Sequence, residues 1–208
     1  MMTFDNSLCL CIVIVDMSRR DTKLLSLYVR ALIESTTNKK RVLRIFDFDD
    51  TLVKTDSRIH VLTASGDKLS LTSGEYAVYA PQYGDKFDYS DFSKLVNPSE
   101  IKWTTKILKR IIAKGGEVVI LTARSDPKPV RQFINDINLA YVEVVALGDS
   151  DPQKKAEYIS RRLDEEDFNE VEFFDDSYKN ILAVANISAD YPDVKIITRH
   201  VTHTPKIN

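Results

Sequence analysis

Asp47 and Asp49 stand two residues apart at the end of an apolar, β-prone segment, Val42–Phe46. A strand points alternate residues the same way, so both carboxylates would face one ligand. Carboxylates this close together repel each other and require a nearby cation, a shared proton or both. Open α/β sheets bind their ligands at the carboxyl ends of the strands. The pair therefore predicts a ligand site at a strand end, rather than two acids of an ordinary turn or helix cap.

Functional groups also stand where later apolar segments end. Thr122 closes an aliphatic run, and its hydroxyl could donate a hydrogen bond to a phosphoryl oxygen. Lys154 and Lys155 open the helix expected after the next strand, and Asp175 and Asp176 end another apolar segment. Each signal is weak alone, but their order along the chain is specific.

This order of groups resembles the haloacid dehalogenase (HAD) superfamily, whose members are mostly phosphatases. The pattern Asp-x-Asp-x-Thr-Leu at 47–52 is similar to its motif I, and Thr122 is similar to motif II. The lysine pair at 154–155 resembles motif III, and the acidic pair at 175–176 resembles motif IV. The chain looks most similar to short, minimally capped HAD-like proteins of phages and bacteria, and to the phosphatase halves of polynucleotide repair enzymes.

The resemblance implies a mechanism through an aspartyl-phosphate intermediate. Asp47 would be the nucleophile, and Asp49 would be the general acid for the leaving oxygen and then the base for water. Mg²⁺ would be held by Asp47, the Asp49 backbone carbonyl and Asp175, with Asp176 close by. Thr122 and one lysine would hold the phosphoryl oxygens.

Several roles stay open at this point. Lys155 is favoured over Lys154 as the phosphate-binding lysine, and only one can face the site because neighbouring helical residues point about 100° apart. Asp176 could accept hydrogen bonds from the lysine or from loop amides instead of contacting the metal. Thr122 could cap its strand. Arg124 could bind a substrate phosphate or form a structural salt bridge.

The elements that must position these groups alternate between strand and helix from residue 41 onward, which predicts an α/β fold with a doubly wound parallel sheet. The resemblance implies that this sheet is the HAD-like Rossmannoid core. The expected strands are 42–47, 117–122, 141–147, 171–175 and 194–198. The expected helices contain residues 101–112, 130–137, 152–163 and 181–185.

Residues 53–97 interrupt this alternation after the first core strand. Ile59–Thr63 and Lys68–Leu71 predict a β-hairpin turning near Gly66, and the following residues are rich in aromatics and expected to be strand and loop. We interpret the segment as a flap over the site, whose aromatics form either a small core or a stacking platform for bases. An open site of this kind suits bulky substrates, and it suits small ones if an oligomer covers it.

Residues 1–40 are interpreted as an N-terminal arm without assigned chemistry, preceding a catalytic domain at 41–208. A strand at 8–15 and a helix near 21–35 are expected there, and Cys9 and Cys11 are interpreted as small hydrophobic residues. The apolar run is too short to span a membrane and lacks a basic leader, so we expect a cytoplasmic protein. A formal net charge of -2 argues against a strongly basic nucleic-acid binder, although it leaves room for a local basic groove.

The sequence thus predicts an Mg²⁺-dependent phosphomonoester hydrolase of the HAD type. Its substrate would be a small phosphorylated molecule or a nucleotide or polynucleotide end, and no membrane partner is expected. The alternative is a non-catalytic module on the same fold that binds phosphate, nucleic-acid ends or phosphoproteins. The complete set of acids, Asp47, Asp49, Asp175 and Asp176, favours catalysis.

Overall fold

The computed structural model describes residues 23–29 and 40–202. The chain divides into two compact units, Met1–Lys40 and Arg41–Asn208. In the first unit, residues 23–29 are helical, within the helix predicted near 21–35, whereas the strand predicted at 8–15 lies outside the described residues. Within the described residues, no helix has the length and apolar character needed to cross a membrane.

The second unit is built on a five-stranded sheet in which every neighbouring pair of strands is parallel. The strand order is β10-β9-β1-β7-β8. The bounds are β1 (Val42–Phe46), β7 (Glu117–Thr122), β8 (Glu143–Ala146), β9 (Glu170–Asp175) and β10 (Lys195–His200). This arrangement confirms the predicted α/β class and the parallel sheet, and each predicted core strand is present with ends shifted by at most two residues.

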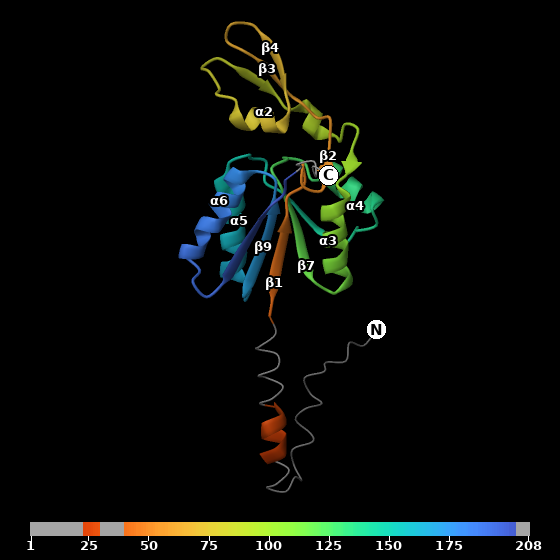
Figure 1. Cartoon of the computed structure of the whole chain (residues 1–208), viewed down its shortest axis with the longest axis vertical. Helices are drawn as coiled ribbons and strands as arrows, with labels where there is room; N and C mark the ends of the chain where they lie inside the picture. The colour runs from red at the N-terminus through yellow and green to blue at the C-terminus, as the bar shows by residue number, and fades with distance from the viewer. Residues whose placement is uncertain (1–22, 30–39, 203–208) are drawn as a thin grey trace, which may run out of the picture. The chain divides into compact units, whose positions relative to one another are not determined.

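Helices cover both faces of this sheet, as Figure 1 shows with α3 and α4 on one side and α5 and α6 on the other. Their bounds are α3 (Lys102–Ala113), α4 (Lys128–Asp136), α5 (Pro152–Glu165) and α6 (Tyr178–Asn186), and the short helix η2 (Ile187–Ala189) follows α6. The alternation of β1 explains the two layers, because Leu43 and Ile45 enter one hydrophobic core and Phe46 enters the other. The Phe46 ring stacks on Phe174 of β9 at a centroid distance of 4.2 Å.

The insert after β1 contains the predicted hairpin, formed by β3 and β4 with Gly66 at φ +93° in the turn. Its elements are β2 (Val53–Lys54), β3 (Ile59–Leu62), β4 (Lys68–Leu71), α2 (Ser73–Val78), β5 (Lys86–Asp88), η1 (Ser90–Ser93) and β6 (Ser99–Glu100). Helix α2 corrects the expectation of strand and loop alone. It is too short to show periodicity, and a capping box between Thr72 and Glu75 starts it.

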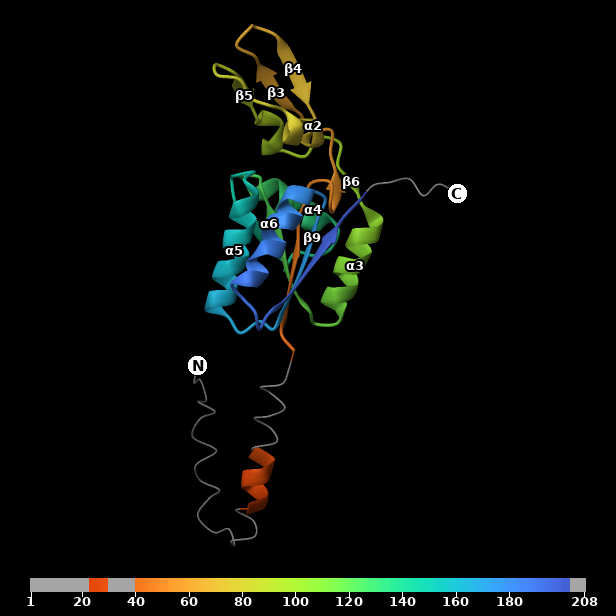
Figure 2. The same cartoon turned by 60° about the vertical axis from the view of Figure 1, so that its left-hand side comes forward.

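The aromatic residues of the insert pack on one another and form a small core. The ring of Phe87 contacts Tyr76, Tyr79 and Tyr89 at centroid distances of 5.8 to 6.2 Å. The hydroxyls of Tyr76 and Tyr89 share a 2.6 Å hydrogen bond. The sequence left open a small core or a stacking platform for bases, and the structure shows these aromatic rings packed on one another as a small core. In Figure 1 and Figure 2 the insert lies beyond the carboxyl ends of the core strands.

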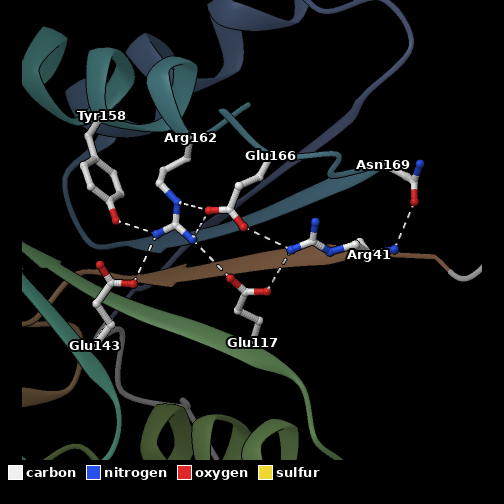
Figure 3. Close-up of polar contacts among 7 residues, drawn as sticks. All are labelled: Arg41, Glu117, Glu143, Tyr158, Arg162, Glu166 and Asn169. Atoms are coloured by element: carbon white, nitrogen blue, oxygen red, sulfur yellow. Dashed lines mark hydrogen bonds and ion pairs between the residues drawn. The ribbon is translucent and has the colours of Figure 1, made fainter. Parts of the chain in front are cut away.

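A charged network joins the opposite, amino edge of the sheet to α5 (Figure 3). Arg162 is its centre, and its guanidinium donates hydrogen bonds of 2.8 to 3.2 Å to four side chains, those of Glu166, Tyr158, Glu117 and Glu143. Arg41 joins the network through Glu166 at 3.0 Å. The network fastens the end of α5 to the first residues of β7 and β8 and lies at the far end of the strands from the predicted site.

Candidate functional site

The first core strand delivers Asp47 into the middle of the sheet's carboxyl edge. The backbone N–H of Asp47 donates to the carbonyl of Phe174 at 2.9 Å, which continues the pairing of β1 with β9 by one residue. The chain then turns at Asp50, whose φ is 54°. Because β1 lies between β9 and β7, the buried Asp47 lies between the carboxyl ends of these two strands.

Lys155 lies between two of the predicted acids. Its Nζ is 2.6 Å from Asp47 Oδ1 and 2.7 Å from Asp175 Oδ2, and all three side chains are buried. Lys155 belongs to the first turn of α5, which begins at Pro152 after the N-cap residue Asp151. Lys154 points elsewhere and pairs with the exposed Glu157 at 2.9 Å. Of the two lysines considered from the sequence, the structure therefore places Lys155 in the site.

Asp47, Asp175 and Asp176 form a compact cluster, with one carboxylate oxygen of each within 4.8 Å of the others. Asp175 ends β9, and it accepts hydrogen bonds from the Ser177 backbone N–H at 2.8 Å and from Asn180 Nδ2 at 3.0 Å. These bonds fix the direction of the carboxylate, and Asn180 comes from the first turn of α6. The four predicted positions Asp47, Lys155, Asp175 and Asp176 thus meet at one place.

The cluster carries three carboxyl groups against one ammonium, and its electrostatics reflect that excess. Burial raises the pKa of Asp47 well above its usual range, and Asp175 and Asp176 raise it further, although Lys155 acts in the opposite direction. Burial, together with Asp175 and Asp50, raises the pKa of Asp176 to about 7. Burial opposes the charge of Lys155, but Asp47 and Asp175 outweigh it and raise the pKa of this lysine. The arrangement favours the uptake of a proton or a cation.

Asp49 is bound by Arg124 and its carboxylate is not part of this cluster. Arg124 Nε donates to Asp49 Oδ2 at 2.8 Å, and Nη2 donates to Oδ1 at 2.7 Å. Arg124 Nη1 also donates to the carbonyls of Phe92 and Lys94 in the insert, at 2.9 and 3.0 Å. The Arg124 side chain is 1% exposed and that of Asp49 is 20% exposed. Of the two roles considered for Arg124, the structure shows the salt bridge.

Thr122 is buried at the end of β7, on the same edge of the sheet. Its Oγ1 accepts a hydrogen bond from the Arg124 backbone N–H at 3.2 Å, which is the capping role considered from the sequence. The hydroxyl hydrogen is not used in that bond, so the side chain can still donate to an anion.

Sequence reasoning missed two groups that shape the cluster. Thr51 Oγ1 accepts from the Asp176 backbone N–H at 3.2 Å, and Asn180 holds Asp175 from five residues downstream. An amide side chain one helical turn after an acidic pair was the available signal for Asn180. The role of Thr51 depends on the approach of residues 125 positions apart, and no local pattern indicates it.

The sequence matches no protein-family model and no curated protein. The fold and the geometry therefore define the class. The protein is an α/β protein with a Rossmann-like parallel sheet, and at the carboxyl edge of that sheet a lysine bridges two acids of a buried acidic cluster.

Proposed function

We propose that this protein is an Mg²⁺-dependent phosphomonoester hydrolase that acts through an aspartyl-phosphate intermediate on Asp47. The observation that carries the proposal is the bridge made by Lys155 between Asp47 and Asp175, with Asp176 beside them. A nucleophilic carboxylate needs a positive partner to receive an anionic substrate, and a buried lysine next to it supplies one.

The residues of the cluster fit a magnesium ion. Mg²⁺ prefers hard oxygen donors and is commonly held by one or two carboxylates together with water and substrate phosphate. Asp47, Asp175 and Asp176 offer such oxygens within 4.8 Å of one another, and one lysine, Lys155, stands against these three carboxyl groups. With the Asp49 backbone carbonyl, these residues would hold the ion. When bound, it would offset the repulsion between the carboxylates and the substrate phosphate.

The side chains have separate tasks in this reaction. The Asp47 carboxylate attacks phosphorus, a bond from its oxygen to phosphorus forms, and the bond from phosphorus to the leaving oxygen breaks. Asp49 donates a proton to the leaving oxygen and later accepts one from the water that hydrolyses the intermediate. Lys155 and Thr122 hold the other phosphoryl oxygens. Since Arg124 occupies both oxygens of Asp49, proton transfer requires the Asp49 carboxyl group to change partners.

The same ion pair favours a second candidate function, a module that binds phosphorylated partners without hydrolysis. An acid that stays bound to Arg124 would leave the site able to bind phosphate but unable to protonate a leaving group. The two functions differ in turnover and share phosphate binding, so a kinetic experiment separates them.

The decisive experiment measures hydrolysis of p-nitrophenyl phosphate with Mg²⁺ and with EDTA, for the native chain and for Asp47→Asn. Asp167→Asn is the matched control, because Asp167 is an exposed acid away from the cluster. We expect Mg²⁺-dependent turnover that Asp47→Asn abolishes and Asp167→Asn preserves, together with a phosphoenzyme that hydroxylamine cleaves. Turnover that survives Asp47→Asn contradicts the mechanism. Phosphate binding without turnover of aryl and nucleotide phosphates supports the binding module.

A further inference from the structure

A groove of about 800 Å³ lies beside the sheet, between α3 and the edge strand β10. One wall is the exposed stripe of α3 that carries Trp103, Arg110 and Lys114. The other side comes from β1, β9 and β10, with Arg44 and Arg199 among its residues. Helix α3 follows β6 in the chain and contacts β7, and the groove lies between this helix and the β10 side of the sheet.

The groove is basic although the whole chain has a formal net charge of -2. Four cationic side chains line it, those of Arg44, Arg110, Lys114 and Arg199, against a single carboxylate, Glu172. Glu172 accepts hydrogen bonds from Arg44 at 2.8 Å and from Arg199 at 2.9 Å.

Arg110 and Lys114 are exposed, and neither forms an ion pair within residues 40–202. The surplus positive charge is therefore available to an anionic partner. Cations that line a groove focus the electrostatic field there, and this field raises the local concentration of an anionic partner.

An exposed aromatic ring stands at one end of the groove. Trp103, the only tryptophan of the chain, is 47% exposed on the first turn of α3. Arg110 and Lys114 follow on the same face, about 10 and 16 Å further along the helix axis at 1.5 Å per residue. A row of cations that begins at an aromatic ring matches a partner with regularly spaced negative charges and flat apolar rings.

The aromatic end of the groove also approaches the candidate site. His200, at the end of β10, lines the groove, and its Nε2 lies 2.8 Å from the Asp176 carbonyl. The next residue, Val201, donates its backbone N–H to the Asp175 carbonyl at 2.9 Å. An extended partner in the groove would therefore run toward the acidic edge of the sheet.

We propose that this groove binds single-stranded nucleic acid, with backbone phosphates on Arg110, Lys114 and Arg199 and a base stacked on Trp103. A partner with charge alone, such as an acidic protein segment, would leave the exposed indole unused. The inference concerns binding of the strand itself, so it does not require the acidic cluster to be catalytic.

The test is fluorescence anisotropy with the full chain and labelled single-stranded RNA and DNA of about 12 nucleotides without terminal phosphates. The groove variants are Arg110→Glu and Trp103→Ala. Their matched controls are Arg161→Glu, an exposed arginine on α5 across the sheet, and Tyr141→Ala, an exposed aromatic before β8. Thermal unfolding of each variant checks that the fold is kept, and Lys114→Gln provides a milder charge change.

We expect saturable binding that weakens about tenfold in Trp103→Ala, the size of the loss of one stacked base. Arg110→Glu and Lys114→Gln should weaken binding and reduce the salt dependence, by about 0.7 in the slope of log K against log salt for each lost phosphate contact. The two control variants should bind as the native chain does. The Asp47→Asn variant should also bind normally, whatever its turnover, which separates this proposal from the proposed function.

Three results would overturn the proposal. The native chain could fail to bind either strand at about 50 mM salt, where phosphate contacts are strongest. The control variants could lose as much affinity as the groove variants. Polyglutamate could compete fully while Trp103→Ala has no effect, which would assign the groove to an acidic protein segment instead.

Discussion

Arg124 holds both carboxylate oxygens of Asp49, with Nε at 2.8 Å and Nη2 at 2.7 Å. The same guanidinium donates its third group, Nη1, to two backbone carbonyls of the insert. One buried side chain therefore connects the predicted general acid to the segment that lies over the site. We therefore expect a movement of the insert to be coupled through Arg124 to a change of partner at Asp49.

Replacing Arg124 by glutamine should destabilise the protein. The change removes a bidentate ion pair and leaves the carbonyls of Phe92 and Lys94 without this donor, and we expect a loss of about 2–3 kcal/mol in the free energy of unfolding. This expected loss is smaller than the loss for breaking a fully buried ion pair, because the Asp49 side chain is 20% exposed. Urea denaturation measures the loss, and limited proteolysis should cut the insert faster. An insert that stays equally protected would refute the coupling.

Replacing Lys155 by methionine should destabilise the protein far more than the same change at Lys154. Without Lys155, two buried carboxylates lose their only cationic partner within the described cluster, which costs about 3–5 kcal/mol. Lys154 is an exposed partner of Glu157, and its replacement should leave the unfolding transition unchanged. Added Mg²⁺ should recover part of the loss in Lys155→Met. Equal effects of the two variants would contradict the placement of Lys155.

In the absence of divalent ions, the protein should become less stable as the pH rises from about 5 to 8. Burial and neighbouring acids raise the pKa of Asp176 to about 7 from an ordinary value of 3.8. The folded state therefore binds more protons than the unfolded state between these values, so the free energy of unfolding falls as the pH increases through them. Asp47, whose pKa is also raised, acts in the same direction.

Urea unfolding at the two pH values in EDTA measures this dependence. The Asp176→Asn variant should flatten it, and Asp167→Asn should leave it as in the native chain. Mg²⁺ should stabilise the native protein more at the higher pH, because deprotonated carboxylates bind the ion. A metal-free stability that is constant or increases over this range would contradict the crowded-acid description of the cluster.

The charged network at the amino edge of the sheet should contribute to the stability of the fold without affecting the candidate site. Arg162→Met keeps the length of the side chain but removes the hydrogen bonds to Tyr158 and three glutamates, and we expect a loss of about 1–2 kcal/mol. The glutamates are between 33% and 52% exposed, so water can replace the lost donor. Arg161→Met, on the adjacent exposed position, is the control. Any phosphatase turnover should be unchanged at temperatures where both variants are folded.

The order of strands and helices and the set of residues at the strand ends could be predicted from the sequence. The segments Val42–Phe46 and Glu117–Thr122 are mostly apolar over a strand's length, and this local property favours a strand buried in a parallel sheet. Once the strands are parallel, their carboxyl ends share one edge, so Asp47 and Asp175 could be expected at the same edge of the sheet. Helix α2 escaped prediction because six residues carry too little periodic signal.

Only the tertiary structure decided which groups contact each other within that edge. Lys154 and Lys155 are adjacent lysines that the sequence alone does not distinguish. The rotation of α5 about its axis points Lys155 toward the sheet and Lys154 toward solvent. Arg124 finds Asp49 from 75 positions away, and the groove combines residues of α3 with residues of β1, β9 and β10. A sequence pattern indicates which residues lie on the same face of a single helix or strand. The distances between elements are set by packing, where helix phase and strand register bring together side chains that no local spacing relates.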